Sequence, residues 1–279
     1  MNKIDQQLCK KCMLCTEVCP CNVIGVNEQK ELYFIPEREK ICQECGQCMA
    51  VCKTRAMTVN GFSYESDFKE LPARSLPFAD FIDFLSGRRS VRNFRDKAVP
   101  DEMIDNILES VCYAPYGAAP EKMCITVINS RERIQLALPH MEEFLNNVVR
   151  WMENPVASYM IKRKRNPETY NTLRNHLYPI SKLGNYRLEL GDRITRGAPA
   201  LLIFHAAEEA EAHSENAMIY ATYTMLAAHA LGLGASMNGI ISPAINKNQR
   251  VREVFDIPAS HEASISLMLG YPRLSYRRT

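Results

Sequence analysis

Two cysteine runs decide the fold of the first sixty residues: CKKCMLCTEVCP at 9–20 and CQECGQCMAVC at 42–52. Each run has the spacing Cys-x-x-Cys-x-x-Cys-x-x-x-Cys, and every cysteine of the first run recurs 33 residues later in the second. Three further pairs repeat at this interval: Ile24 and Met57, Val26 and Val59, and Asn27 and Asn60. We interpret the repeat as the duplication of a whole structural unit.

The spacing of these cysteines separates two kinds of metal site. Paired Cys-x-x-Cys units also occur in zinc sites, but those sites close with four ligands, usually as two separated pairs. Three cysteines at two-residue gaps with a fourth three residues on are typical of [4Fe–4S] clusters, whose fourth cysteine ligates the other cluster. The first sixty residues therefore resemble the bacterial two-cluster ferredoxins.

This resemblance implies a crossed set of cluster ligands. Cys9, Cys12, Cys15 and Cys52 would hold one cluster, and Cys42, Cys45, Cys48 and Cys19 would hold the other. Two positions depart from the pattern. Lys53 replaces the proline that often follows the last cysteine, and Cys21 is a ninth cysteine, which we interpret as a packing residue. Because such small modules have little core, we expect metal binding to supply much of the folding energy.

Composition describes an ordinary globular chain apart from its cysteines. The 279 residues are 46% hydrophobic and 24% charged, with a net charge of +2, which does not support a nucleic-acid-coating protein. Nine of the 11 cysteines precede residue 53, yet the start MNKIDQQLCKKC lacks the apolar segment of a secretory signal. We therefore expect a reducing cytoplasm rather than a disulfide scaffold.

The uncharged stretch 216–247 contains polar residues and Pro243, and predicts a buried helix and a buried strand rather than a membrane span.

The chain divides where periodicity is lost. Residues 61–77 contain two prolines and are typical of a surface connection, so we predict a ferredoxin-type domain over 1–64, a linker over 65–77 and a second domain over 78–279. In the second domain, apolar spacing predicts helices over 78–85 and 101–114 and strands over 124–129, 199–205 and 263–269. This mixture indicates an α+β fold around one sheet.

Residues 130–198 show a weaker pattern. We interpret them as a cover over the active site, and the basic run 162–165 as a solvated helix face.

A second motif, GRRSVRNF at 87–94, follows the first of these helices. Three guanidinium groups and a hydroxyl within five residues offer bidentate donors suited to a phosphate, although an exposed basic turn has the same composition. Three segments accompany it: APYGAAP at 114–120, GLGA at 232–235 and LGYP at 269–272. In this order and spacing, the chain from Phe78 to its end resembles the nitroreductase-like flavoprotein family.

That resemblance implies FMN, usually bound at the interface of a homodimer with an intertwined α+β fold. Arg88, Arg89, Ser90 and Arg92 would face the phosphate and the ribityl chain, and Pro115, Tyr116 and Gly117 would lie beside the isoalloxazine. The backbone of Met237, Asn238 and Gly239 would reach the flavin N5 edge, and Arg277 and Arg278 are candidates for the basic residue that approaches the phosphate of the partner-side flavin. Ala119 and Glu121 stand where many relatives have Asn and Gln, so a side-chain contact there is not expected.

The apolar helix predicted from residue 216 to 231 fits the same dimer. An all-round apolar helix must be covered on every side. A second copy of the chain would cover Met218, Tyr220, Tyr223, Met225 and Leu226. We interpret His205, His229 and His261 as structural histidines with satisfied hydrogen bonds rather than as catalytic bases.

No Ser-His-Asp set, paired carboxylates or P-loop can be assigned, so the catalytic residues stay unassigned; a flavin enzyme needs none of these. We predict an oxidoreductase that passes electrons between two [4Fe–4S] clusters and FMN and reduces a nitroaromatic or quinone-like compound. The alternative is an electron-transfer protein that exchanges electrons with a partner protein, with the second domain as a docking or regulatory module. No GxGxxG fingerprint follows a strand, so NAD(P)H would have to dock over the flavin, and a ferredoxin is the other candidate donor.

Overall fold

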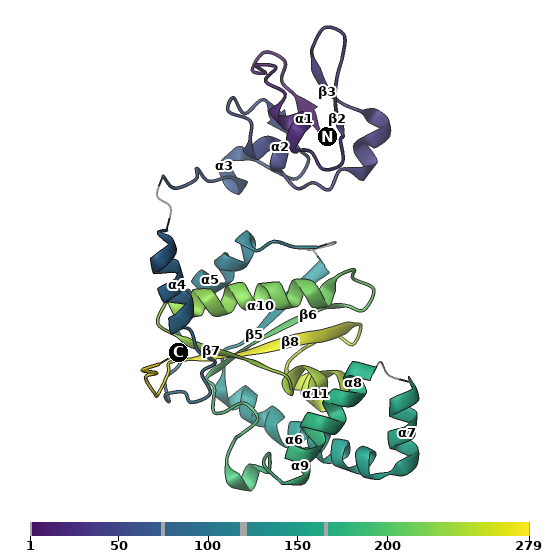
Figure 1. Ribbon diagram of the computed structural model, residues 1–279, viewed down its shortest axis with the longest axis vertical. Coiled ribbons are helices and arrows are strands. Elements are labelled where there is room, and N and C mark those ends of the chain that lie inside the picture. Colours follow the sequence, from purple (N-terminus) through teal and green to yellow (C-terminus); the bar gives the residue numbers. More distant parts are fainter. Residues whose placement is uncertain (1, 74–75, 118–121, 165–166, 279) are drawn as a thin grey trace. The chain divides into compact units, whose positions relative to one another are not determined.

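The computed structural model describes residues 2–73, 76–117, 122–164 and 167–278 (Figure 1). The chain forms two compact units, Met1–Ser75 and Leu76–Thr279. The division between them falls inside the segment 65–77 that we expect to be a linker.

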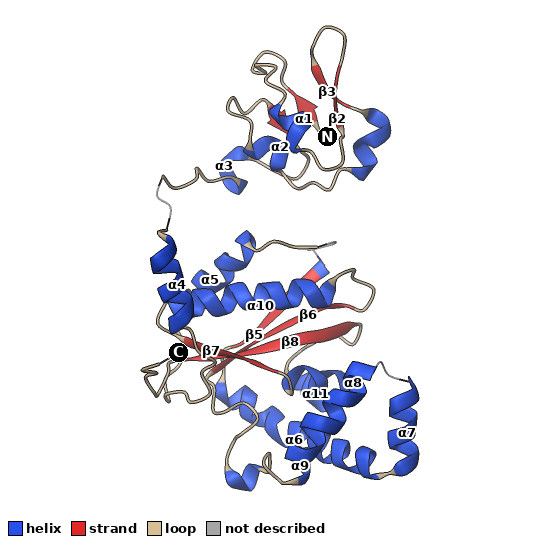
Figure 2. Cartoon of the chain, in the orientation of Figure 1, coloured by secondary structure: helices blue, strands red, loops and turns tan. Residues whose placement is uncertain are grey.

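The first unit consists of short elements joined by long loops (Figure 2). Its strands are β1 (Lys3–Ile4), β2 (Ile24–Val26), β3 (Leu32–Phe34) and β4 (Met57–Thr58), and its helices are α1 (Leu14–Val18), η1 (Pro36–Ile41), α2 (Gln47–Ala50) and α3 (Tyr64–Asp67). Strands β1 and β4 pair antiparallel, as do β2 and β3. The buried core is small and consists of Cys15, Val23, Ile24, Leu32, Met49, Met57 and Val59.

The 33-residue repeat of the sequence reappears in the backbone of this unit. Three pairs of residues with positive φ are each 33 residues apart: Lys11 (53°) and Glu44 (47°), Met13 (64°) and Gly46 (68°), and Asn22 (50°) and Arg55 (55°). Left-handed backbone is uncommon for residues other than glycine, so its recurrence at one interval is a specific conformational signature. The duplicated sequence therefore folds into a duplicated backbone.

The second unit is built on a four-stranded antiparallel sheet with the strand order β5-β6-β8-β7. The strands are β5 (Met123–Ile128), β6 (Ala200–Ala207), β7 (Gly234–Asn238) and β8 (His261–Gly270). These bounds confirm the three predicted strands and the buried strand expected after the apolar helix. Strand β6 is almost wholly buried because it lies between two neighbours and is covered on both faces.

Helices cover both faces of the sheet (Figure 1). Helices α5 (Asp101–Glu109) and α10 (His213–Ala230) pack on one face, and α6 (Arg131–Glu153), α11 (Ile241–Lys247) and α12 (Gln249–Val254) pack on the other side. Helix α10 confirms the predicted buried helix. The prediction that a second copy covers Tyr220 is wrong, because this side chain is only 7% exposed and packs in the core beneath α10.

The helix predicted over 101–114 is shorter than expected. The α-helix ends at Glu109 and continues as one 3-10 turn, η2 (Ser110–Tyr113). Ala114 is already extended, with a ψ of 138°, because the proline that follows it disfavours helical backbone at the preceding residue. The predicted helix over 78–85 is confirmed as α4 (Phe78–Gly87).

The segment with the weakest sequence pattern is largely helical. After α6 it contains α7 (Pro155–Lys164), α8 (Pro167–Thr172), a π-helical turn η4 (Leu173–Leu177), α9 (Tyr178–Lys182) and η5 (Leu188–Leu190). The basic run lies at the end of α7 with Lys162, Arg163 and Lys164 exposed, which agrees with a solvated helix face; Arg165 lies outside the described residues. Among the helices described, none has both the length and the apolar composition required to cross a bilayer.

Candidate functional site

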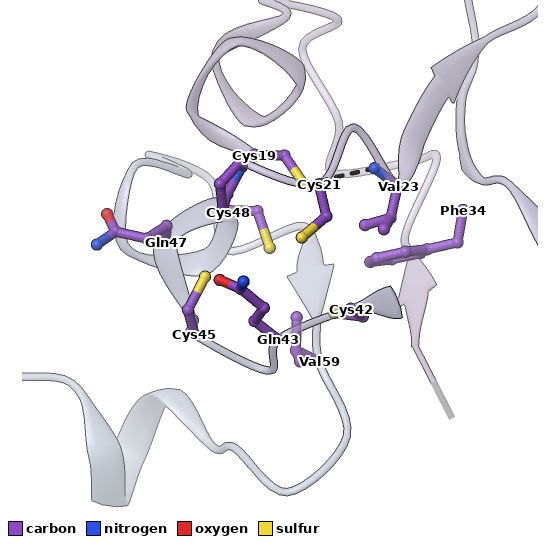
Figure 3. Close-up of a pocket in the computed structure, with 12 residues that line it drawn as sticks. Cys19, Cys21, Val23, Phe34, Cys42, Gln43, Cys45, Gln47, Cys48 and Val59 are labelled. Atoms are coloured by element: carbon purple, nitrogen blue, oxygen red, sulfur yellow. Dashed lines mark hydrogen bonds between the residues drawn. The ribbon is translucent and has the colours of Figure 1, made fainter. Parts of the chain in front are cut away.

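The cysteines of the first unit gather around two pockets. One pocket is lined by Cys19, Cys42, Cys45 and Cys48, together with Cys21 (Figure 3). The other, of about 260 Å³, is lined by Cys9, Cys12, Cys15 and Cys52. Each pocket therefore takes three cysteines from one run and the fourth from the other run.

Backbone amides point at several of these sulfurs. The amide of Val23 donates to Cys19 Sγ at 3.5 Å, and the amide of Ala56 donates to Cys52 Sγ at 3.2 Å, 33 residues further on. Burial raises the pKa of Cys52, but hydrogen bonds from Ala56 and Thr54 outweigh it and leave this pKa below its usual value. Amide donors of this kind stabilise thiolate ligands and tune iron–sulfur clusters.

Other thiols of the two pockets are buried and ionise reluctantly. Burial raises the pKa of Cys15 and the pKa of Cys48 to about 11, and the neighbouring cysteines add to the shift. A cation within the pocket would reverse this preference, because metal ligation requires the thiolate. The four-cysteine donor set of each pocket therefore fits a positively charged metal core better than four free thiols. Cys21 is half-buried against the same core but also lines its pocket, which we did not expect.

In the second unit, the arginine loop is fixed to the edge of the sheet at two points. Ser90 forms a parallel bridge with Ala235 of β7, and the amide of Val91 donates to the Ala235 carbonyl at 3.1 Å. Phe94 forms an antiparallel bridge with Pro272, just after β8. Both apolar residues of the loop, Val91 and Phe94, are buried. The intervening polar side chains are therefore held at defined positions beside the sheet.

A cleft of about 430 Å³ opens between this loop, the end of α10 and the C-terminal segment. It is lined by Gly87, Arg88, Arg89, Val91, Arg95, Met225, His229, Gly232, Leu233, Ala235, Tyr271, Pro272, Leu274, Ser275 and Tyr276. The lining contains three arginines and no carboxylate, and no salt bridge within the described ranges neutralises these arginines. The cleft is therefore electropositive and suited to a phosphate.

Individual contacts orient the three guanidinium groups. Arg88 Nη1 lies 3.7 Å from the Met225 sulfur, and Arg89 lies over the Tyr276 ring at 5.9 Å. Arg95 Nε donates to the Pro272 carbonyl at 2.9 Å. Each contact leaves other guanidinium N–H groups available to an anion, because a guanidinium carries five donors.

The cleft contains some of the predicted phosphate-binding residues and lacks others. Arg88 and Arg89 line it, whereas Ser90 is engaged in the bridge to β7 and Arg92 is exposed outside the cleft. Arg95, which sequence reasoning missed, takes the third position. The signal that could have indicated Arg95 is its position directly after Phe94, an apolar residue between polar neighbours: Phe94 is buried and Arg95 is exposed.

The loop predicted to lie beside the isoalloxazine is anchored elsewhere. The amide of Gly117 donates to Asn216 Oδ1 at 2.7 Å, at the start of α10, whereas Arg88 lies at Met225, nine residues along that helix. At 1.5 Å per residue, these contacts are ~14 Å apart along the helix axis. Tyr116 is 50% exposed. Ala119 and Glu121 lie outside the described residues.

The remaining predicted flavin contacts also lie outside the cleft. The buried Asn238 side chain donates to the Ile194 carbonyl at 2.7 Å and accepts from the Ile240 amide at 2.8 Å, so it fixes the start of α11. Met237 is half-buried and Gly239 is exposed, so backbone is accessible at this end of β7. Arg277 and Arg278 directly follow Tyr276 and are exposed.

The three histidines have partners, as a structural role requires. His229 lines the cleft with Nε2 at 3.1 Å from the Phe84 carbonyl. His205 Nε2 lies 2.8 Å from Thr126 Oγ1, and its Nδ1 lies 2.8 Å from His261 Nδ1. Burial and then the neighbouring His261 lower the pKa of His205 to about 4, so this imidazole is neutral at neutral pH.

A sequence model of the nitroreductase family matches residues 85–271. The chain belongs to the nitroreductase family. It is accordingly an oxidoreductase of this family. The three arginines of the cleft lie within the matched region, whereas the segment from Pro272 to Tyr276 that completes the cleft follows it, and the cysteine-rich unit precedes it.

Individual relatives agree with this assignment. The chain is 24% identical over 194 residues to a protein named "Putative NADH dehydrogenase/NAD(P)H nitroreductase" from Methanothermobacter thermautotrophicus. The aligned residues make up 69% of this chain and 78% of the relative. Two solved nitroreductases with bound FMN share the fold of this chain. The Bacteroides fragilis protein is 19% identical with a TM-score of 0.51, and the Desulfitobacterium hafniense protein is 20% identical with a TM-score of 0.50. Each of these two matches covers 71% of this chain and 92% of the solved chain.

The position of the arginine loop in this nitroreductase-family domain depends on Gly234. A Cβ at Gly234 would lie 2.6 Å from Val91 Cγ2, so Gly234→Ala must displace the loop. We expect the free energy of unfolding to fall by about 1–3 kcal/mol, the usual cost of overpacking. Urea denaturation followed by the fluorescence of Trp151, the single tryptophan, reports on this unit alone.

Gly239→Ala is the matched control for this substitution. An added Cβ at Gly239 meets no heavy atom within 4 Å, so its free energy of unfolding should change by no more than about 0.5 kcal/mol. Equal destabilisation by the two alanines would contradict the close approach of Gly234 and Val91.

Proposed function

We propose that this chain is an FMN- and iron–sulfur-dependent oxidoreductase that passes electrons between two [4Fe–4S] clusters and FMN and reduces a small organic acceptor, such as a nitroaromatic or quinone-like compound. The observation that carries the proposal is an arginine-lined cleft in a nitroreductase-family domain that follows a unit with two four-cysteine pockets. FMN would exchange one or two electrons and each cluster one, so together they convert single-electron to two-electron chemistry.

The cysteine pockets support the iron–sulfur part of the proposal. The set Cys9, Cys12, Cys15 and Cys52 and the set Cys19, Cys42, Cys45 and Cys48 are the crossed groups that the ferredoxin resemblance implies. The chain contributes the thiolates, and the amides of Val23 and Ala56 stabilise the negative charge on two of them. In this proposal residues 1–64 form a two-cluster domain, 65–77 a linker and 78–279 the flavin domain.

The arginine cleft supports the FMN part. Arg88, Arg89 and Arg95 would bind the phosphate by charge-assisted hydrogen bonds, and the two solved relatives named above are described with bound FMN. The half-buried His229 and Met225 would exclude water from one side of the bound group. Arg277 and Arg278 extend the positive charge beyond Tyr276.

We further propose that two copies of the chain complete each flavin site. The Pro115–Gly117 loop and Arg88 meet α10 at contacts ~14 Å apart in one protomer, so one copy does not bring them to one place. Exposed apolar side chains accompany these segments: Met218 of α10 is 47% exposed, and Phe78 of α4 is 76% exposed. A homodimer that buried these side chains could bring the Pro115–Gly117 loop of one copy to the arginines of the other.

This dimer predicts the effect of a charge on α10. Met218→Glu should convert a dimer to a monomer in sedimentation velocity, because an unpaired carboxylate buried in the interface is costly. Leu136→Glu is the matched control, since Leu136 is 66% exposed on α6, on the other side of the sheet, and should leave the dimer intact. A wild-type monomer, or a dimer unaffected by Met218→Glu, would exclude this interface.

The proposed activity is tested with protein purified without oxygen. Iron, sulfide and FMN are quantified, and the reduction of a nitroaromatic and of a quinone is then measured with NADH, NADPH or reduced ferredoxin as the donor. The proposal expects about eight iron atoms and about one FMN per chain, and turnover with at least one donor. A protein with intact clusters, full folding and no affinity for FMN would overturn it in favour of an electron carrier.

A further inference from the structure

We propose that Cys124, His205 and His261 form a binding site for a transition-metal ion of the zinc class. One ligand atom from each residue lies within 4.8 Å of the other two. This group belongs neither to the cysteine pockets of the first unit nor to the arginine cleft.

Strand pairing brings the three residues together. Cys124 of β5 lies directly opposite His205 of β6, and His261 of β8 is paired with Ala207, two residues further along β6. A register shift between Phe204 and His205 places this irregular end of β6 beside β8. His205 is five residues from Ala200, the end of β6 nearest the arginine loop, so the site lies ~17 Å along the strand from that end.

The distance between the two imidazole nitrogens needs little adjustment to fit a tetrahedral ion. Zinc binds imidazole nitrogen at about 2.0–2.1 Å and thiolate sulfur at about 2.3 Å, which places two ligand nitrogens about 3.3–3.4 Å apart. The Nδ1 atoms of His205 and His261 are 2.8 Å apart. They would therefore separate by about half an ångström as the ion replaces the shared proton.

The neighbouring contacts orient these ligands. Thr126 Oγ1, 2.8 Å from His205 Nε2, can accept the Nε2 proton and so leave a lone pair on Nδ1, the atom that faces His261. His205 is buried, whereas Cys124 and His261 are half-buried, so an ion has access from solvent and a water molecule can complete the fourth position. A hydrogen bond to the ring nitrogen that does not bind the ion is typical of metal-binding histidines.

Charge near the group favours a site that includes a thiolate. The Arg252 guanidinium donates to the carbonyl of His261 at 2.7 Å and therefore places a positive charge beside the cluster. Two neutral imidazoles alone would hold a divalent cation poorly in this field. The Cys124 thiolate supplies the compensating negative charge, so its loss should abolish binding.

The test compares zinc content in full-length variants after the iron–sulfur clusters have been reconstituted. Each protein is equilibrated with Zn²⁺, dialysed and analysed for metal. Wild type should retain about one zinc ion per chain more than Cys124→Ser. Cys112→Ser is the matched control, because Cys112 is an exposed cysteine of the same unit outside the group, and it should match wild type. Zinc bound by the first unit is common to all the variants and cancels in the difference.

Cobalt gives a second readout. Co²⁺ bound by one thiolate and two imidazoles should add a thiolate charge-transfer band to wild type and to Cys112→Ser, but not to Cys124→Ser. Because Cys124→Ser alters a half-buried side chain, His261→Asn is measured in parallel, and it should lose the same zinc ion and the same band. Equal zinc content in wild type, Cys124→Ser and His261→Asn, all folded by circular dichroism, would show a hydrogen-bonded histidine pair without a metal and overturn the proposal.

Discussion

Arg88→Ala is expected to weaken FMN binding about 10- to 100-fold. Arg88 is half-buried in the cleft, and among the described residues the Met225 sulfur is the hydrogen-bond partner of its side chain. A hydrogen bond to a charged group contributes about 1.5–3 kcal/mol, and 1.4 kcal/mol corresponds to a tenfold change in affinity. Titration of the apoprotein with FMN, followed by the quenching of flavin fluorescence, measures the change directly.

Two further arginines make this experiment discriminating. Arg95→Ala should weaken binding as Arg88→Ala does, because Arg95 lines the same cleft. Arg163→Ala, on the exposed face of α7, is the control and should leave the affinity unchanged. Arg92 is expected to contribute from the family resemblance but lies outside the cleft, so Arg92→Ala should have a smaller effect than Arg88→Ala. Unchanged affinity in both Arg88→Ala and Arg95→Ala would contradict phosphate binding in this cleft.

Cys52→Ser is expected to halve the iron and sulfide content, from about eight to about four atoms of each per chain. Cys52 lies in the pocket of Cys9, Cys12 and Cys15, more than thirty residues earlier in the chain. Loss of one ligand should therefore remove the cluster of the first run and leave the cluster of the second. Chemical analysis of iron and sulfide, with the visible spectrum of the oxidised protein, measures the loss.

Double variants test the crossed arrangement. Adding Cys9→Ser to Cys52→Ser should cause no further loss, because both residues serve one cluster, whereas adding Cys48→Ser should remove the remaining iron. Cys21→Ser is the matched control and should keep about eight iron atoms, although Cys21 lines a pocket. If Cys52→Ser with Cys48→Ser lost no more iron than Cys52→Ser alone, the two residues would share a cluster and the assignment would be wrong.

Local patterns made much of this fold predictable. The cysteine repeat could be found from sequence alone, and pairs such as Met13 and Gly46 show the same 33-residue interval in their backbone angles. Strands β5, β6 and β8 were predictable because they are short apolar runs bounded by polar or turn residues. In each case the signal lies in short runs of sequence and their spacing, and does not depend on which distant segments pack together.

Features that depend on long-range packing were not predictable. The cleft exists because Phe94 pairs with Pro272, 178 residues away, which brings Arg95 and Tyr276 to one place. The burial of Tyr220 in the core of its own chain also depends on long-range packing and could not be predicted. Helix α10 is apolar on all sides, so its sequence could not distinguish the face packed on the sheet from the face left exposed.

The most direct test of the central claim is anaerobic stopped-flow reduction of the full chain, with the flavin and cluster absorbances followed separately. NADH, NADPH and reduced ferredoxin are compared as donors. We expect both chromophores to be reduced by the effective donor, the second following the first at a rate that does not depend on protein concentration. Cluster absorbance that stays constant while the flavin turns over with a nitroaromatic acceptor would contradict electron transfer between the two units.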